Sequence, residues 1–210
     1  MFDLLRDAIL DGTLVPGERI RDNDLQERFG MSRTPIRLAL DRLEELRLVE
    51  SRPNRHTRVS SSDPLAVPLS LEVMCSLWAL AARLSVPGLS TAERRECHRR
   101  FEIARSACRE GPSANPSGAV EHLRHALFFL SEKSGNPLLI TMVVNIGLSL
   151  RFQAVLQGHH LDLRSLDTVL RDACRAVDDN DASTVARSLL SIRHLPVLTP
   201  PDEGLAVRAS

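Results

Sequence analysis

Apolar side chains recur at helical spacing through most of this chain, and short polar or glycine-containing breaks separate the periodic segments. In the first sixty residues this pattern predicts three short helices. Two short runs of β-forming residues around a turn follow them, which indicates a hairpin. Beyond the hairpin the periodicity predicts six more helices, at about 69–85, 91–110, 117–134, 137–158, 163–178 and 181–194. The expected fold is mostly α, with a small N-terminal domain followed by an all-α helical bundle.

Changes in composition mark the expected domain boundaries. Residues 1–60 form the small domain, and the polar stretch SSSDP opens a linker at 61–68. The bundle occupies 69–198, and the end of the chain, 199–210, is rich in proline and charge and is expected to be a loose tail. A chain of 210 residues, 43% of them hydrophobic, is long enough for two soluble domains.

The segment from Asn23 to Leu46 predicts two helices joined by a tight break of sequence GMS. Gly30 can adopt the left-handed conformation that ends the first helix, and Ser32 can cap the second with its hydroxyl. Two short amphipathic helices in this order are typical of a helix-turn-helix, whose second helix enters the DNA major groove. The hairpin LVESR-PNRH-TRV follows directly, so the sequence predicts a winged helix-turn-helix.

Removing the apolar positions from the second helix leaves Arg33, Thr34 and Arg37 at its N-terminal end. Arginine can bond guanine bidentately, and a helix N-terminus favours a phosphate. The wing adds three arginines: Arg52, Arg55 and Arg58. Eight arginines and four acids lie between residues 28 and 58, although the formal net charge of the chain is zero. A helical hairpin with a solvated arginine-rich face is the alternative, and the adjacent wing favours DNA binding over it.

These residues resemble the winged-helix domain of the GntR transcription regulators. The resemblance rests on the G-x-L-x-P-G turn at residues 12–17 and on the recognition-helix start SRTPIR at residues 32–37. It implies that residues 32–34 and Arg37 contact DNA and that Arg28 and the wing assist. Two features depart from the family pattern: Leu38 replaces the usual glutamate, and the wing tip is Asn-Arg-His where the family is glycine-rich.

The helical segments after the linker resemble the FCD effector domains of the FadR branch of this family. The marks are LEVMCSLWALAARL (71–84), SGNPLL (134–139) and the closing helix pair around residues 178–182. The resemblance implies a divalent metal held by one Asp and three His, and an Arg on the first bundle helix for a carboxylate effector. In this chain those positions are apolar, and together they define an expected effector pocket: Met74, Leu77, Trp78, Leu123, Leu127, Leu170 and Ile192.

Leucine offers no ligand to a transition metal, so we expect no cofactor and no metal at these positions. The apolar set is either a packed core, which the spacing of the leucines favours, or a site for an apolar ligand. A metal site outside the family pattern remains an alternative, and its candidate ligands are five histidines: His122, His125, His159, His160 and His194.

An enzyme is not expected. The chain has no G-x-S-x-G motif, no glycine-rich phosphate loop after a strand and no H-E-x-x-H; the nearest sequence, EHLRH at 121–125, lacks the required histidine spacing.

The four cysteines are widely separated in the sequence, which indicates buried free thiols in a reducing compartment. No signal peptide or membrane span is expected, which favours a cytoplasmic protein. Nearly all basic residues are arginine, which suggests a bacterial source.

The sequence therefore predicts a bacterial DNA-binding transcription regulator. We expect it to bind a pseudo-palindromic double-stranded operator as a homodimer, because one recognition helix reads only a few base pairs. The bundle is expected to bind a small apolar or weakly polar effector. Two alternatives remain open: a regulator without an effector, whose bundle serves only to dimerise, and a nonspecific DNA-binding protein.

Overall fold

The computed structural model describes residues 1–52, 56–110, 116–158 and 160–198. The chain folds into two compact units. The first, here the winged-helix unit, comprises Met1–Val67 together with Asn145–Gln157, and the second, the bundle unit, comprises the remainder.

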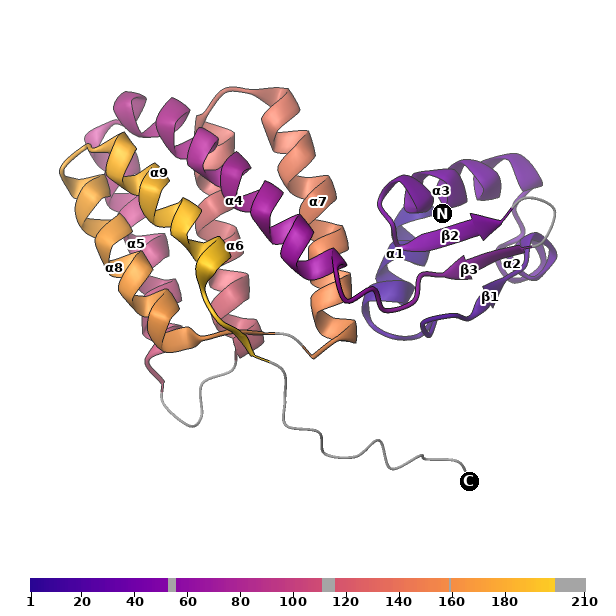
Figure 1. The fold of residues 1–210 in the computed structure, drawn as a ribbon. Coiled ribbons are helices and arrows are strands. Elements are labelled where there is room, and N and C mark those ends of the chain that lie inside the picture. The colour runs from indigo at the N-terminus through magenta and orange to yellow at the C-terminus, as the bar shows by residue number, and fades with distance from the viewer. Residues whose placement is uncertain (53–55, 111–115, 159, 199–210) are drawn as a thin grey trace. The chain divides into compact units, whose positions relative to one another are not determined.

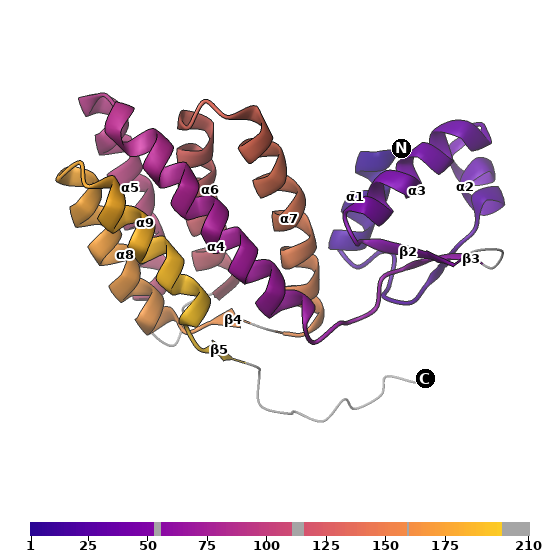
Figure 2. The ribbon, with the colours of Figure 1, turned by 45° about the horizontal axis from the view of Figure 1, so that its top comes forward.

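The winged-helix unit contains three helices and a three-stranded antiparallel sheet of order β1-β3-β2 (Figure 1). Figure 2 shows the helices on one side of the sheet. Its elements in chain order are α1 (Phe2–Leu10), β1 (Arg19–Ile20), α2 (Asp22–Phe29), α3 (Arg33–Glu45), β2 (Val49–Arg52) and β3 (His56–Val59). The sequence predicts all of these except β1, which is too short to show an alternating pattern.

The core of this unit forms where the apolar faces of α1 and α3 meet the sheet. Leu5 and Ile9 of α1 pack with Ile36 and Leu43 of α3, and all four are almost fully buried. Phe152 from the end of α7 completes the same core. Full burial of such a side chain contributes about 1.5–3 kcal/mol, so this core fixes α3 on the sheet while its opposite face stays in solvent.

The expected linker at 61–68 is more ordered than its composition indicates. Gln153 is buried, accepts a hydrogen bond from the backbone N–H of Asp63 at 3.0 Å and donates to the carbonyl of Ser61 at 3.1 Å. Gln157 donates to the carbonyl of Asp63 at 2.7 Å. The helix α4 already begins at Ala66. Side chains more than eighty residues away hold this stretch, so local composition alone does not reveal it.

The bundle unit is built from helices that Figure 1 shows side by side. They are α4 (Ala66–Ser85), α5 (Thr91–Cys108), α6 (Pro116–Lys133), α7 (Pro137–Leu156), α8 (Leu163–Asp178) and α9 (Ala182–Ser191). The first two residues of α4 and the part of α7 from Asn145 onward belong to the winged-helix unit. Short 3-10 turns follow α4 (Val86–Gly88) and α9 (Ile192–His194). A two-residue antiparallel ladder joins β4 (His160–Leu161) to β5 (Val197–Leu198). This ladder adds two very short strands to the expected all-α bundle, and two residues are too few to leave a periodic signal in the sequence.

Two helices are long and apolar enough to cross a membrane by length and composition. They are Ala66–Gly88, with half of its most apolar window buried inside the protein, and Pro137–Leu156. Core helices of soluble proteins pass the same test.

Candidate nucleic-acid interface

The turn of the helix-turn-helix is formed by a left-handed glycine. Gly30 has φ +62° and its N–H donates to the carbonyl of Gln26 at 2.9 Å, so α2 ends there. Glycine adopts this conformation without the steric cost that a side chain brings. Ser32 is exposed and occupies the N-cap of α3 as expected, but its hydroxyl makes no capping hydrogen bond.

The two arginines at the start of α3 are exposed, and polar side chains of α2 hold both. Arg33 donates from Nε to Oε1 of Gln26 at 3.2 Å and from Nη2 to Oδ1 of Asn23 at 3.4 Å. Arg37 donates from Nε to Oδ2 of Asp22 at 3.2 Å, and its side chain is 73% exposed. The sequence predicts these two arginines but not their partners on α2, because those contacts depend on how the two helices cross.

Leu38 lies on the same exposed face of α3, next to Arg37 and one turn after Thr34. It is 65% exposed although Ile36 and Ala39 beside it are buried. Thr34 is exposed as well. The face that α3 presents to solvent therefore combines two cations, a hydroxyl and one branched apolar side chain, which are the side-chain types that read guanine edges, phosphates and thymine methyl groups.

The wing contributes positive charge beside this helix. Arg58 is exposed on β3, and its sheet neighbours in register are Arg19 of β1 and Glu50 of β2. Arg19 was not predicted, since β1 itself was not. Arg55 lies outside the described residues, and so does the side chain of Arg52. Arg28 is exposed at the end of α2, with its guanidinium 5.6 Å from the ring centroid of Phe29.

The residues of the expected effector pocket lie in the interior of the bundle unit. All except Leu77, which is partly exposed, are buried: Met74, Trp78, Leu123, Leu127, Leu170 and Ile192. This burial supports the packed core that the spacing of the leucines favours over a site for an apolar ligand.

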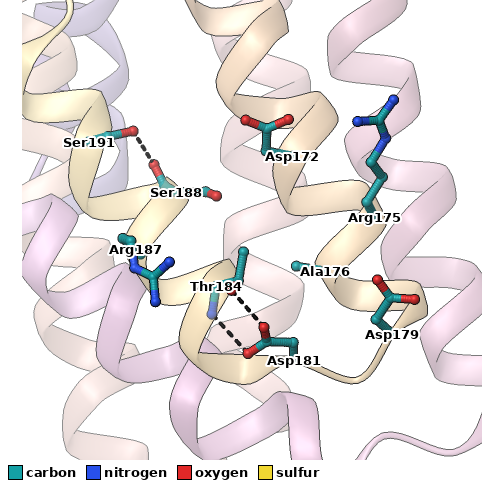
Figure 3. Close-up of a pocket in the computed structure, with 9 residues that line it drawn as sticks. All are labelled: Asp172, Arg175, Ala176, Asp179, Asp181, Thr184, Arg187, Ser188 and Ser191. Atoms are coloured by element: carbon teal, nitrogen blue, oxygen red, sulfur yellow. Dashed lines mark hydrogen bonds between the residues drawn. The ribbon is translucent and has the colours of Figure 1, made fainter.

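An open groove of about 440 Å³ lies elsewhere, between α8 and α9 (Figure 3). Its lining is polar, and Asp181 accepts hydrogen bonds there from the backbone and hydroxyl of Thr184. Arg175 and Arg187 also line it, beside Asp172 and Asp179. The groove is lined by both cations and acids, so its chemistry differs from that of the apolar pocket that we expected.

Three of the five histidines considered as metal ligands have described side chains: His122, His125 and His194. All three are exposed, and within the described part of the chain none of them joins a group of three potential ligands. His125 lies beside Glu121 of its own helix, at 3.2 Å, and His194 accepts from Arg193 at 3.0 Å. His159 and the side chain of His160 lie outside the described residues.

Residues 1–59, which hold α3 and its arginines, match the bacterial regulatory proteins of the gntR family. The N-terminal segment is a GntR-family helix-turn-helix domain. Three HTH-type transcriptional regulators are similar to the chain. McbR of Escherichia coli K12 is 24% identical over 185 residues, which cover 81% of this chain and 82% of McbR. YdhC of Bacillus subtilis is 25% identical over 180 residues, 85% of this chain and 78% of YdhC.

The third regulator, Rv0494 of Mycobacterium tuberculosis, is 37% identical over 71 residues, 33% of this chain; that match spans only 29% of the relative. Among solved structures, Escherichia coli McbR/YncC has a TM-score of 0.62 at 20% identity. A GntR structure from Rhodococcus sp. RHA1 has a TM-score of 0.60 at 19% identity. Each match covers 92% of this chain and 91% of the other. The predicted fold, a GntR domain followed by a helical domain, is confirmed.

Proposed function

We propose that this protein is a bacterial transcription regulator that binds a pseudo-palindromic DNA operator through α3. The observation that carries the proposal is the pair of exposed guanidinium groups, Arg33 and Arg37, that α2 holds at the N-terminal end of that helix. Arginine in this position can bond the O6 and N7 atoms of guanine or a phosphate oxygen. Arg58 lies on β3 of the wing, and we assign it to backbone phosphates.

The experiment is a selection of bound duplexes from a random DNA library with the full-length protein, followed by affinity measurement on the enriched sequence. We expect a two-fold symmetric site, with half-sites separated by about one helical turn. Enrichment of no sequence would identify a nonspecific DNA-binding protein and remove the operator from the proposal. Arg58→Ala should weaken binding to all sequences alike and reduce its salt dependence, which separates a phosphate contact from a base contact.

We further propose that a second copy of the chain covers an apolar face of α4. Leu69, Val73, Leu80 and Leu84 are exposed, and their spacing of four, seven and four residues places them on one face of the helix. Met74 and Trp78 are buried on the opposite face. A helix that is apolar on both faces is normally buried on both, so the exposed face indicates an interface. The first half of α7 adds Leu138, Met142 and Val144 to the exposed apolar residues of the bundle unit.

A homodimer matches the two-fold operator, because two recognition helices related by a dyad read two half-sites. The predicted small-molecule effector remains a proposal for the bundle. The burial of the pocket residues supports packing at that position, and with it a regulator whose bundle serves to dimerise. A ligand that raises the melting temperature of the bundle and also changes operator affinity would support an effector; a shift in melting temperature with unchanged affinity would rule it out.

We propose no metal at the positions that the family uses, no enzymatic activity and a cytoplasmic location. The buried leucines offer no ligand atoms, which supports the first. The similarity to transcriptional regulators supports the second and third.

A further inference from the structure

Four potential metal ligands face one another across two helices of the bundle unit. His98 and Glu102 are one turn apart on α5, and Cys174 and Asp178 are one turn apart on α8. Residues four apart share one face of a helix. The two helices run antiparallel, because His98 contacts Asp178 near one end while Arg105 contacts Asp167 near the other. The two pairs therefore lie opposite each other.

Three of these side chains bring unlike donor atoms close together. One ligand atom each from His98, Glu102 and Cys174 lies within 4.8 Å of the other two. Cys174 is buried, whereas the side chains of His98 and Glu102 are each 38% exposed. Because two of the three donors are partly exposed, an ion in solvent can reach the group.

Asp178 orients the imidazole of this group. Nδ1 of His98 lies 3.0 Å from the Asp178 carboxylate, on the next turn of α8 after Cys174. A carboxylate bonded to a histidine ring is the usual outer partner of a metal-bound histidine, because it fixes the ring and increases its basicity.

Glu102 can be released to a metal without leaving its arginines unpaired. It accepts hydrogen bonds from Arg105 at 2.6 Å and from Arg109 at 2.8 Å. Arg105 also donates to Asp167 at 3.1 Å, and Arg109 lies 3.8 Å from the same carboxylate. Asp167 therefore remains as a partner for both guanidinium groups when Glu102 turns to a cation.

We propose that His98, Glu102 and Cys174 form a binding site for Zn²⁺ that bridges α5 and α8. Zinc accepts nitrogen, sulfur and carboxylate ligands together, and three protein ligands leave the fourth position to water. The site uses none of the positions at which the family resemblance implies a metal. It departs from the sequence-based expectation of no metal, because that expectation considered other residues.

Burial raises the pKa of the Cys174 thiol to about 11, against the influence of the nearby Arg105. The free thiol is therefore protonated at neutral pH and is not a reactive nucleophile. Zinc binding forms the Zn–S bond and releases one proton from this thiol to solvent. No oxidant or reductant takes part.

The test is metal binding by the untagged full-length protein after removal of metals with a chelator. We expect one Zn²⁺ per chain in a competition titration, and with Co²⁺ a near-ultraviolet charge-transfer band from thiolate to metal. Cys174→Ala should abolish that band, and His98→Ala should weaken zinc binding at least tenfold. Asp178→Asn should weaken it by about 10- to 100-fold through loss of the ring's orientation.

His122→Ala and Cys75→Ser are matched controls, since they remove an exposed histidine of α6 and a buried thiol of α4. Both should bind zinc as the wild type does. The cobalt spectrum is recorded on the wild-type protein, so it does not depend on whether the variants fold. The absence of a thiolate band in that spectrum overturns the proposal by itself. Unchanged zinc affinity in folded Cys174→Ala and His98→Ala protein would also overturn it.

Discussion

Arg37 of α3 donates from Nε to the carboxylate of Asp22 at the start of α2, across 3.2 Å. Arg33 has a similar relationship to Gln26 and Asn23. The first helix of the motif thus holds the guanidinium groups of the second in a limited set of directions. Restricting a long side chain before binding reduces the entropy lost when it meets DNA.

Replacing Asp22 with Asn should raise affinity for nonspecific DNA and lower discrimination between operator and nonspecific duplex. The change removes a negative charge near the DNA and frees Arg37 to follow phosphates. Stability should change by less than about 1 kcal/mol, because the Arg37 side of the ion pair is 73% exposed, although the Asp22 side chain is only 27% exposed. Fluorescence anisotropy on both duplexes measures the ratio. Asp24→Asn is the control, an exposed acid on the same helix. Equal effects of the two variants would mean that only net charge matters.

Leu38 should read a thymine methyl group. We expect Leu38→Ala to leave the free energy of unfolding within about 0.5 kcal/mol of wild type, because the side chain is exposed, and to weaken operator binding. Replacing the contacted thymine by uracil removes only the methyl group, so it should weaken wild-type binding and leave Leu38→Ala unaffected. A scan of uracil substitutions with both proteins measures this coupling. Additive losses at every thymine would contradict the contact.

Val73→Glu should separate the dimer into monomers, since it places a charge in the apolar face of α4 that the second copy covers. Sedimentation equilibrium measures the association, and operator affinity should fall with it. Val120→Glu on α6 is the control, because that valine is exposed to a similar degree, 39% against 46%. The α4 interface is wrong if Val73→Glu remains dimeric.

Acid should weaken the contact between α5 and α6 at Glu93. Hydrogen bonds from Lys133, at 2.6 Å, and from Ser90 lower the pKa of Glu93 to about 2 from its ordinary 4.5. A lowered folded-state pKa stabilises the fold above about pH 4.5, and this contribution is lost as the pH falls toward 2.

Glu93→Gln should therefore lower the urea midpoint at pH 7, and the difference from wild type should shrink as the pH approaches 3. Glu132→Gln, an exposed acid on α6, provides the control titration. A difference that stays constant across this pH range would show that the charge of Glu93 does not stabilise the bundle.

Much of the winged-helix unit could be predicted because its signals are local. Ile36, Leu40 and Leu43 recur at helical spacing, and Gly30 marks the turn directly. The same spacing predicts that Arg33 and Arg37 lie on the solvent-exposed face of α3. Their contacts to α2 could not be predicted, since the approach of the two helices depends on tertiary packing.

The remaining differences involve residues that are distant in the sequence. Gln153 orders the linker from more than eighty residues away. His98 and Glu102 are separated from Cys174 by about seventy residues, so no short motif joins them. Five histidines were candidate ligands because they lie close together in the sequence or near the positions that the family uses. The three of them with described side chains join no cluster of three potential ligands.

Operator affinity of the Arg33→Ala/Arg37→Ala double variant tests the central claim most directly. Arg95→Ala, an exposed arginine of α5, serves as the control. Each base-reading arginine accounts for about 1–3 kcal/mol of discrimination. We therefore predict at least a 25-fold loss of operator affinity (about 2 kcal/mol) for the double variant, with the fold intact by circular dichroism and with binding by Arg95→Ala unchanged. Wild-type affinity in the folded double variant would contradict the assignment of α3 as the recognition helix.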